Sequence, residues 1–151
     1  MKKSKDIASQ FIEIAPKMVR TTKAEIRHVA QGKITHPQYR ILANINRGTN
    51  TVSQIALNQG VSQPAMSKNV DALVRKGLID RVPQSTDRRQ ITLQLSKKGN
   101  TLFQKLKTLA AARLAEKFKV FSPSELAELH DSLTTLDSLL KKLMEKQQDQ
   151  A

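Results

Sequence analysis

The sequence predicts a mainly α-helical protein with one small β-hairpin. Apolar residues recur every three or four positions through most of the 151 residues, which is the period of an amphipathic helix. Residues 91–95, ITLQL, alternate between apolar and polar side chains, which is the period of a half-buried strand. Capping residues and glycines recur between these segments, and they divide the chain into successive elements.

The first predicted helix covers residues 5–31. Four apolar residues mark its face: Ile7, Phe11, Ile14 and Met18. Pro16 lies inside this pattern and is expected to kink or split the helix, because proline has no backbone N–H to donate. The second predicted helix lies within residues 34–48, where Thr35 and Gln38 have the spacing of a capping box.

Two shorter helices are predicted within residues 51–60 and 61–77. Gly60 can adopt the left-handed conformation that ends the first of them, and Ser62 is expected to cap the second. The buried stripe of the second is formed by Met66, Val70, Leu73 and Val74. Two amphipathic helices joined by a glycine turn of this length are typical of a helix-turn-helix.

Residues 78–82 and 91–95 are predicted to pair as an antiparallel hairpin. Pro83 favours a projecting tip over a continued ladder, because proline cannot donate to a neighbouring strand. The apolar side of the second strand is Ile91, Leu93 and Leu95, and the polar side is Thr92 and Gln94. A helix-turn-helix followed at once by a hairpin predicts a winged helix-turn-helix.

Two long helices are predicted after the hairpin, the first from Ser96 and the second from a capping box formed by Ser122 and Glu125. Six leucines in the last helix follow alternating spacings of three and four: Leu126, Leu129, Leu133, Leu136, Leu140 and Leu143. Such a heptad seam favours a homodimer built from the first, fifth and sixth helices. Packing of the seam within one chain is the alternative.

The charge of the chain is strongly basic and unevenly distributed. There are 26 Lys and Arg residues against 13 Asp and Glu, for a net charge of +13. Residues 33–99 carry a net +8, residues 1–32 carry +4 and residues 100–151 carry only +1. A balance this basic indicates a polyanionic partner, which is a nucleic acid or, less often, an anionic membrane surface.

Several classes of protein are excluded or disfavoured by what the sequence lacks. It has no cysteine, so disulfides, thiolate metal sites and thiol redox sensing are excluded. No apolar run has the length of a membrane span, and no apolar signal core follows the basic N-terminus, so a cytoplasmic protein is expected. No phosphate loop, nucleophile elbow or metal-ligand spacing is present, so we expect neither an enzyme nor a cofactor.

The polar face of the predicted recognition helix carries the main candidates for DNA contact. These are Ser62, Gln63, Pro64, Ser67, Lys68 and Arg75. Gln63, Ser67 and Lys68 lie in the N-terminal turns, the part of such a helix that enters a major groove, and they can reach base edges or phosphates. The alternative is an ordinary solvated face.

Arg88 and Arg89 lie at the predicted hairpin tip and are further DNA-binding candidates. A narrow minor groove concentrates negative potential and attracts inserted arginine. We expect Arg88 to enter that groove and Arg89 to reach back to Asp71 on the recognition helix. Asp71 and Asp87 are therefore candidate supports of the hairpin. A simple turn in which an arginine pairs with Asp87 is the alternative.

A second alternative concerns Asp71 alone. Lys68 and Arg75 are placed to pair with it along the same helix, one turn before it and one turn after it.

The segment NTVSQIALNQGVSQPAMSKNVDALVRKGLIDRVPQSTDRRQITLQLSKKG resembles the DNA-binding core of the MarR family of transcription regulators. The Ile55–Ala56 pair, the recognition helix and the DRR sequence at 87–89 carry the likeness, and FSPSELAEL resembles the last helix of that family. The resemblance implies three parts: an N-terminal dimerisation helix at 1–32, a winged helix-turn-helix lobe at 33–99, and C-terminal dimerisation helices at 100–151.

The resemblance also implies partners. They are double-stranded DNA with a palindromic operator, a second copy of the chain, and a small phenolic or anionic effector that releases the DNA. His28, Tyr39 and Arg40 are the candidate residues of an effector pocket, from their position near the helix junctions. Repression is the expected mode of regulation, and a nonspecific or architectural nucleic-acid-binding protein is the alternative. With three scattered histidines, no metal site is expected.

Overall fold

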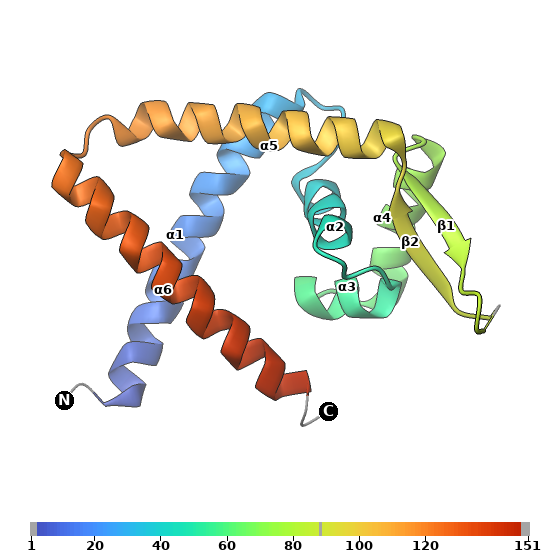
Figure 1. The fold of residues 1–151 in the computed structure, drawn as a ribbon, viewed down its shortest axis with the longest axis horizontal. Helices are drawn as coiled ribbons and strands as arrows, with labels where there is room; N and C mark the ends of the chain where they lie inside the picture. Colours follow the sequence, from blue (N-terminus) through green and yellow to red (C-terminus); the bar gives the residue numbers. More distant parts are fainter. Residues whose placement is uncertain (1–2, 88, 149–151) are drawn as a thin grey trace. The chain divides into compact units, whose positions relative to one another are not determined.

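The computed structural model describes residues 3–87 and 89–148. Within them the elements follow in the order α1 (Ser4–Ala30), α2 (His36–Asn46), α3 (Val52–Gln59), α4 (Gln63–Arg75), β1 (Ile79–Pro83), β2 (Ile91–Leu95), α5 (Lys97–Phe118) and α6 (Pro123–Gln148). Figure 1 traces this order along the chain. The predicted class, mainly helical with one hairpin, is confirmed. The chain divides into two compact units, Met1–Ala112 and Arg113–Ala151.

Helix α1 is one continuous helix of 27 residues. Pro16 lies inside it and does not split the helix. The alternative expectation, a kink at Pro16, stays a prediction. Its buried residues all lie near the C-terminal end: Glu25, Ile26 and Ala30. The apolar face that the sequence predicts, from Ile7 to Met18, is exposed to solvent in the single chain.

The core of the first unit is formed where α2, α3, α4 and the hairpin pack together. Its fully buried members include Ile41, Leu42, Ile55, Met66, Val70, Leu73, Ile79, Leu93 and Leu106. Local capping places the helices as predicted. Thr35 and Gln38 form a complete capping box at the start of α2, and the Ser62 hydroxyl accepts from the backbone N–H of Ala65 at the start of α4.

The hairpin pairs β1 with β2 in antiparallel register, with Ile79 opposite Leu95 and Pro83 opposite Ile91. The ladder therefore reaches Pro83, one residue further than predicted, and the N–H of Gln84 still donates to the carbonyl of Gln90. Pro83 is tolerated there because it stands at the end of a two-stranded edge.

The predicted alternation along β2 holds only in part. Leu93 is buried, but Ile91 is 51% exposed because the hairpin extends beyond the core at that pair. Thr92, predicted on the polar side, is buried, and its hydroxyl donates to the carbonyl of Val82. The N–H of Leu93 donates to the carbonyl of Asn50, so the segment before α3 covers the outer edge of β2.

The first turn of α5 is fixed to the turn between α4 and β1. The Ser96 backbone N–H donates to the carbonyl of Leu78, and the Ser96 hydroxyl donates to the carbonyl of Gly77. Gly99 is buried directly against Leu78, where a Cβ atom would overlap the carbonyl group. These contacts hold the start of β1 and the end of β2 at one point.

Helix α6 starts at the predicted capping box. The N–H of Ser122 donates to the Glu125 carboxylate, and the N–H of Glu125 donates to the Ser122 hydroxyl. These hydrogen bonds lower the pKa of Glu125, because they stabilise its charged form.

None of the six leucines of the predicted seam is buried in the single chain. In the part of the chain that the structure describes, no helix has the length and apolar character needed to cross a membrane.

The packing of Gly99 against Leu78 predicts the effect of adding one methyl group. Gly99→Ala is expected to lower the free energy of unfolding by about 1–3 kcal/mol, because α5 must move away from a backbone carbonyl that cannot yield. Asn100→Ala, at the next and exposed position, is the control and should change stability little. Denaturant unfolding measures both, and equal stability of the two variants would contradict the account.

Candidate nucleic-acid interface

The N-terminal turns of α4 present polar side chains to solvent over a fully buried inner stripe. Met66, Val70 and Leu73 anchor the helix to the core. On the other side Ser62, Gln63, Pro64 and Lys68 are exposed and Ser67 is partly exposed, as the sequence predicts. Gly60, with φ of 65°, makes the turn that sets α4 against α3. The start of α4 is therefore rigidly held and chemically accessible.

Arg75 does not belong to this group of residues. It is exposed at the last residue of α4, twelve residues beyond Gln63. At about 1.5 Å per residue, roughly 18 Å of helix separate the two positions. A contact of Arg75 with DNA would therefore have to be made far from the start of the helix.

A hollow of about 510 Å³ lies between the start of α3, the start of α4 and the outer part of the hairpin. Four glutamines line it: Gln54, Gln63, Gln84 and Gln90. Thr51, Ser53 and Thr92 add hydroxyl groups to the same wall. A primary amide both donates and accepts hydrogen bonds, so this surface can match the mixed donor and acceptor pattern of base edges.

Asp71 joins α4 to the hairpin, but through a different arginine from the one predicted. Its carboxylate forms an ion pair with the guanidinium of Arg81 on β1. The predicted pairing of Asp71 with Arg89 is wrong, and so is the alternative pairing with Lys68 or Arg75. Asp71 therefore holds the hairpin to α4 as expected, but through Arg81.

The register of the hairpin explains why Asp71 pairs with Arg81 and not with Arg89. Arg81 pairs with the buried Leu93, and paired residues project from the same face of an antiparallel sheet, here toward the core. Arg89 comes four residues before Leu93 in the chain. Arg89 lies in the turn before β2, beyond the Pro83–Ile91 pair that ends the ladder, and so further toward the tip than Arg81.

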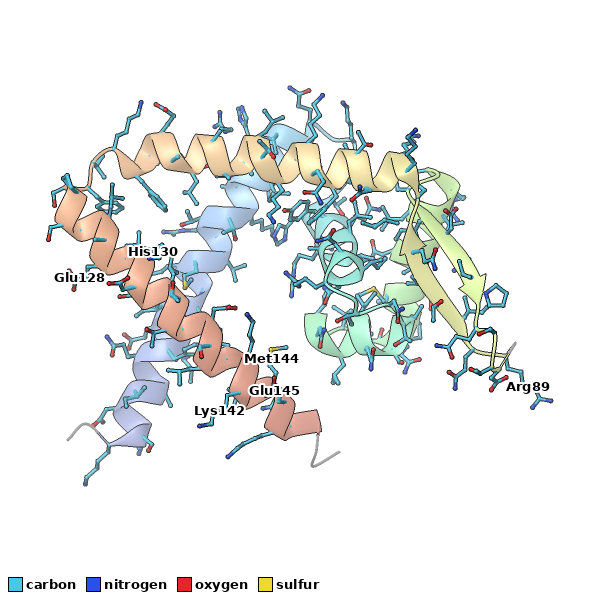
Figure 2. The ribbon with its side chains drawn as sticks, in the orientation of Figure 1. Arg89, Glu128, His130, Lys142, Met144 and Glu145 are labelled. Carbon is cyan, nitrogen blue, oxygen red and sulfur yellow. The ribbon has the colours of Figure 1, made fainter. Side chains whose placement is uncertain are left out.

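The hairpin tip is organised by Asp87. Its carboxylate accepts from the backbone N–H of Arg89 at 2.9 Å, and its carbonyl accepts from the N–H of Gln90 at 3.0 Å. The side chain of Arg89 is exposed and projects from the tip (Figure 2). Asp87 therefore shapes the turn through backbone contacts. Arg88, the predicted minor-groove residue, lies outside the described residues.

In the described part of the chain, no hydrogen bond or ion pair joins the three candidates for an effector pocket. His28 and Arg40 are exposed. Tyr39 is half-buried with its ring 5.4 Å from that of Phe103, and burial raises the pKa of its hydroxyl. The pocket itself stays a prediction.

The surroundings of α2 at its N-terminal end are cationic. The pKa of His36 is lowered, first by burial and then by the charges of Arg40, Lys23 and Arg27.

Among residues 3–87 and 89–148, no group of three or more His, Asp or Glu side chains is placed to hold a metal ion.

Arg81 and three of the four glutamines were missed by reasoning from sequence. Arg81 lies two residues after the buried Ile79, on the same face of β1. Its position toward α4 therefore follows from the strand register once the pairing of β1 with β2 is known. Gln54, Gln84 and Gln90 carry no such signal, because Gln54 lies in α3 and the other two lie in the hairpin loop, so they meet only in the folded chain.

Known proteins resemble this chain in sequence and in fold. The sequence pattern of the MarR family matches residues 33–90. An HTH-type transcriptional regulator of Bacillus subtilis, YfiV, is 28% identical over 106 residues, which cover 70% of this chain and 66% of that protein. The crystal structure of RV1404 from Mycobacterium tuberculosis superposes with a TM-score of 0.74 at 26% identity, over 92% of this chain and 95% of that one.

A MarR family protein from Bacillus stearothermophilus has the same fold. Its TM-score is also 0.74, at 18% identity, over 93% of this chain and 99% of that one. The winged helix-turn-helix fold, with additional long helices on both sides of the lobe, is thereby confirmed.

The ion pair between Asp71 and Arg81 predicts a coupling that can be measured without any ligand. Both groups are partly exposed, so Asp71→Ala and Arg81→Ala should couple by about 0.2–1 kcal/mol in a double-mutant cycle of unfolding free energies. Amide hydrogen exchange in β1 should also quicken in each variant, because the hairpin loses its tie to α4. The matched cycle of Asp71→Ala with Arg89→Ala should be additive, and coupling to Arg89 in place of Arg81 would contradict the structure.

Proposed function

We propose that the chain is a sequence-specific DNA-binding regulator of the MarR family, whose sequence pattern matches residues 33–90. The observation that carries the proposal is the surface formed by the start of α4 and the hairpin. Exposed hydrogen-bonding side chains at that end of α4 are tied to the hairpin by Asp71 and Arg81, within a lobe of net charge +8.

In this proposal the two parts of the surface read different features of the duplex. Gln63 and Ser67 contact base edges in the major groove, where each base pair presents its own pattern of donors and acceptors. Lys68 contacts a phosphate. Arg89 extends from the hairpin tip into the neighbouring minor groove, whose negative potential attracts arginine. The pairing of Asp71 with Arg81 neutralises the one carboxylate on α4, which would otherwise repel the phosphates.

We further propose that the working form is a homodimer. The exposed apolar face of α1 and the unburied leucine seam of α6 support it, because large apolar surfaces of this kind favour a partner chain. A twofold dimer presents two copies of α4 and therefore suits a palindromic operator. Repression, and release of DNA by a small phenolic or anionic ligand, are proposed on the family likeness alone.

Selection of sites from a pool of random duplexes, at physiological salt, tests the proposed DNA recognition. Enrichment of one motif with two inverted half-sites is expected. Equal affinity for selected and random duplexes would overturn sequence-specific recognition and favour an architectural nucleic-acid-binding protein.

Two substitutions in α4 should affect DNA binding in different ways. Gln63→Ala should relax the preference at one base pair of each half-site, at a cost of about 1–3 kcal/mol. Lys68→Ala should weaken binding to all duplexes alike and reduce the salt slope by about one. Lys107→Ala, an exposed lysine of α5, is the matched control. Unchanged operator affinity in both α4 variants would refute the proposed contacts.

The dimer has its own test. Leu136→Asp together with Leu140→Asp should give a monomer or an unfolded chain, because two charges are buried in the proposed seam. Leu139→Asp changes an exposed leucine outside the heptad positions and should leave the dimer intact. Sedimentation at micromolar concentration distinguishes these outcomes, and a well-folded monomer of the unchanged chain would refute the homodimer.

A further inference from the structure

A second cavity, of about 780 Å³, lies where the end of α4, the start of β1 and the start of α5 meet. Five lysines line it: Lys33, Lys76, Lys97, Lys98 and Lys105. No aspartate or glutamate is among its lining residues. Figure 1 shows that these elements meet at the base of the hairpin, the end of the hairpin away from its tip.

Two of the five lysines are held in place by hydrogen bonds without being neutralised. The ammonium group of Lys76 donates to the carbonyl of Lys33 at 2.7 Å, and that of Lys98 donates to the carbonyl of Lys76 at 3.0 Å. A carbonyl is neutral, so both positive charges remain. Lys97 and Lys105 form no ion pair with the described residues. The first turn of α5 adds the positive end of its helix dipole.

The wall of the cavity is also apolar in part. Leu78 is buried at 2% exposure, and Leu102 is partly buried and packs against the core. The methylene chains of the lysines extend this apolar surface. An inorganic anion would leave the apolar wall in contact with water, and a neutral apolar molecule would leave five positive charges without a counterion.

This cavity is separate from the surface assigned to DNA and from the predicted effector pocket. Lys76 follows the last residue of α4, so about 20 Å of helix separate it from Gln63. None of His28, Tyr39 and Arg40 lines the cavity.

We propose that this cavity binds a small organic anion that carries at least two negative charges on an apolar body, such as an aryl or alkyl phosphate. Clustered positive charge beside a low-dielectric wall concentrates field lines and attracts a multiply charged anion more strongly than a singly charged one. The volume is within the range of small-molecule sites. The assignment does not rest on DNA binding and can be tested in its absence.

Calorimetric titration of the full chain with 1-naphthyl phosphate tests the proposal. Three related molecules separate the contributions: 1-naphthoate with one charge, 1-naphthol with none, and inorganic phosphate without the apolar body. The expected order of affinity is naphthyl phosphate first and naphthoate second, with naphthol and inorganic phosphate weakest. Binding of naphthol as tight as that of naphthyl phosphate, or no binding of naphthyl phosphate, would overturn the proposal.

Substitutions locate the site. Lys105→Gln and, separately, Lys97→Gln should each weaken binding of naphthyl phosphate about fivefold. Lys107→Gln removes the same charge from the same helix outside the cavity and should not weaken it. Thermal unfolding verifies that each variant is folded. Equal losses for Lys105→Gln and Lys107→Gln would show nonspecific attraction to a basic protein and overturn the assignment.

A competition experiment distinguishes the small anion from nucleic acid. Duplex DNA at saturating concentration should leave the affinity for naphthyl phosphate unchanged within about twofold, because the two surfaces lie at opposite ends of α4. The proposal is refuted if DNA displaces naphthyl phosphate from the unchanged chain but not from the Lys105→Gln variant. That result would identify the cavity as a nucleic-acid surface.

Discussion

The close packing of Gly99 against the carbonyl of Leu78 is the constraint on which the rest of the lobe depends. It allows the first turn of α5 to lie directly on the turn that leads from α4 into β1, where Ser96 donates to the carbonyls of Gly77 and Leu78. Because β2 leads directly into α5, both strands are fixed at this junction. The hairpin leaves the lobe from a fixed base, and its direction is set before any ligand is bound.

Two further contacts extend that fixed base along the hairpin. The ion pair of Asp71 with Arg81 ties β1 to α4, and the hydrogen bond from the N–H of Leu93 to Asn50 ties β2 to the segment before α3. The start of α3, the start of α4 and the outer part of the hairpin line the hollow with its four glutamines. The recognition helix and the inner part of the hairpin therefore form one continuous surface, while the tip beyond Pro83 depends on the local turn at Asp87.

What the sequence could predict follows from the range of the interactions. The capping boxes at Thr35 and Ser122 involve residues three apart, so their letters were sufficient to place α2 and α6. The buried stripe of α4 followed from helical periodicity. Arg81 as the partner of Asp71, and the burial of Thr92 in place of Ile91, depend on strand register and on a neighbouring loop. No local pattern contains that information, and the same holds for the convergence of the glutamines and of the five lysines.

The central claim is that the start of α4 and the hairpin together form the surface that reads DNA. The most direct measurement is a map of backbone amide chemical-shift changes when the full chain binds a duplex carrying its selected site. The account predicts the largest changes at residues 62–68 and 84–91, with small changes at residues 97–105. Changes concentrated at residues 97–105, or spread evenly over the basic surface, would contradict it.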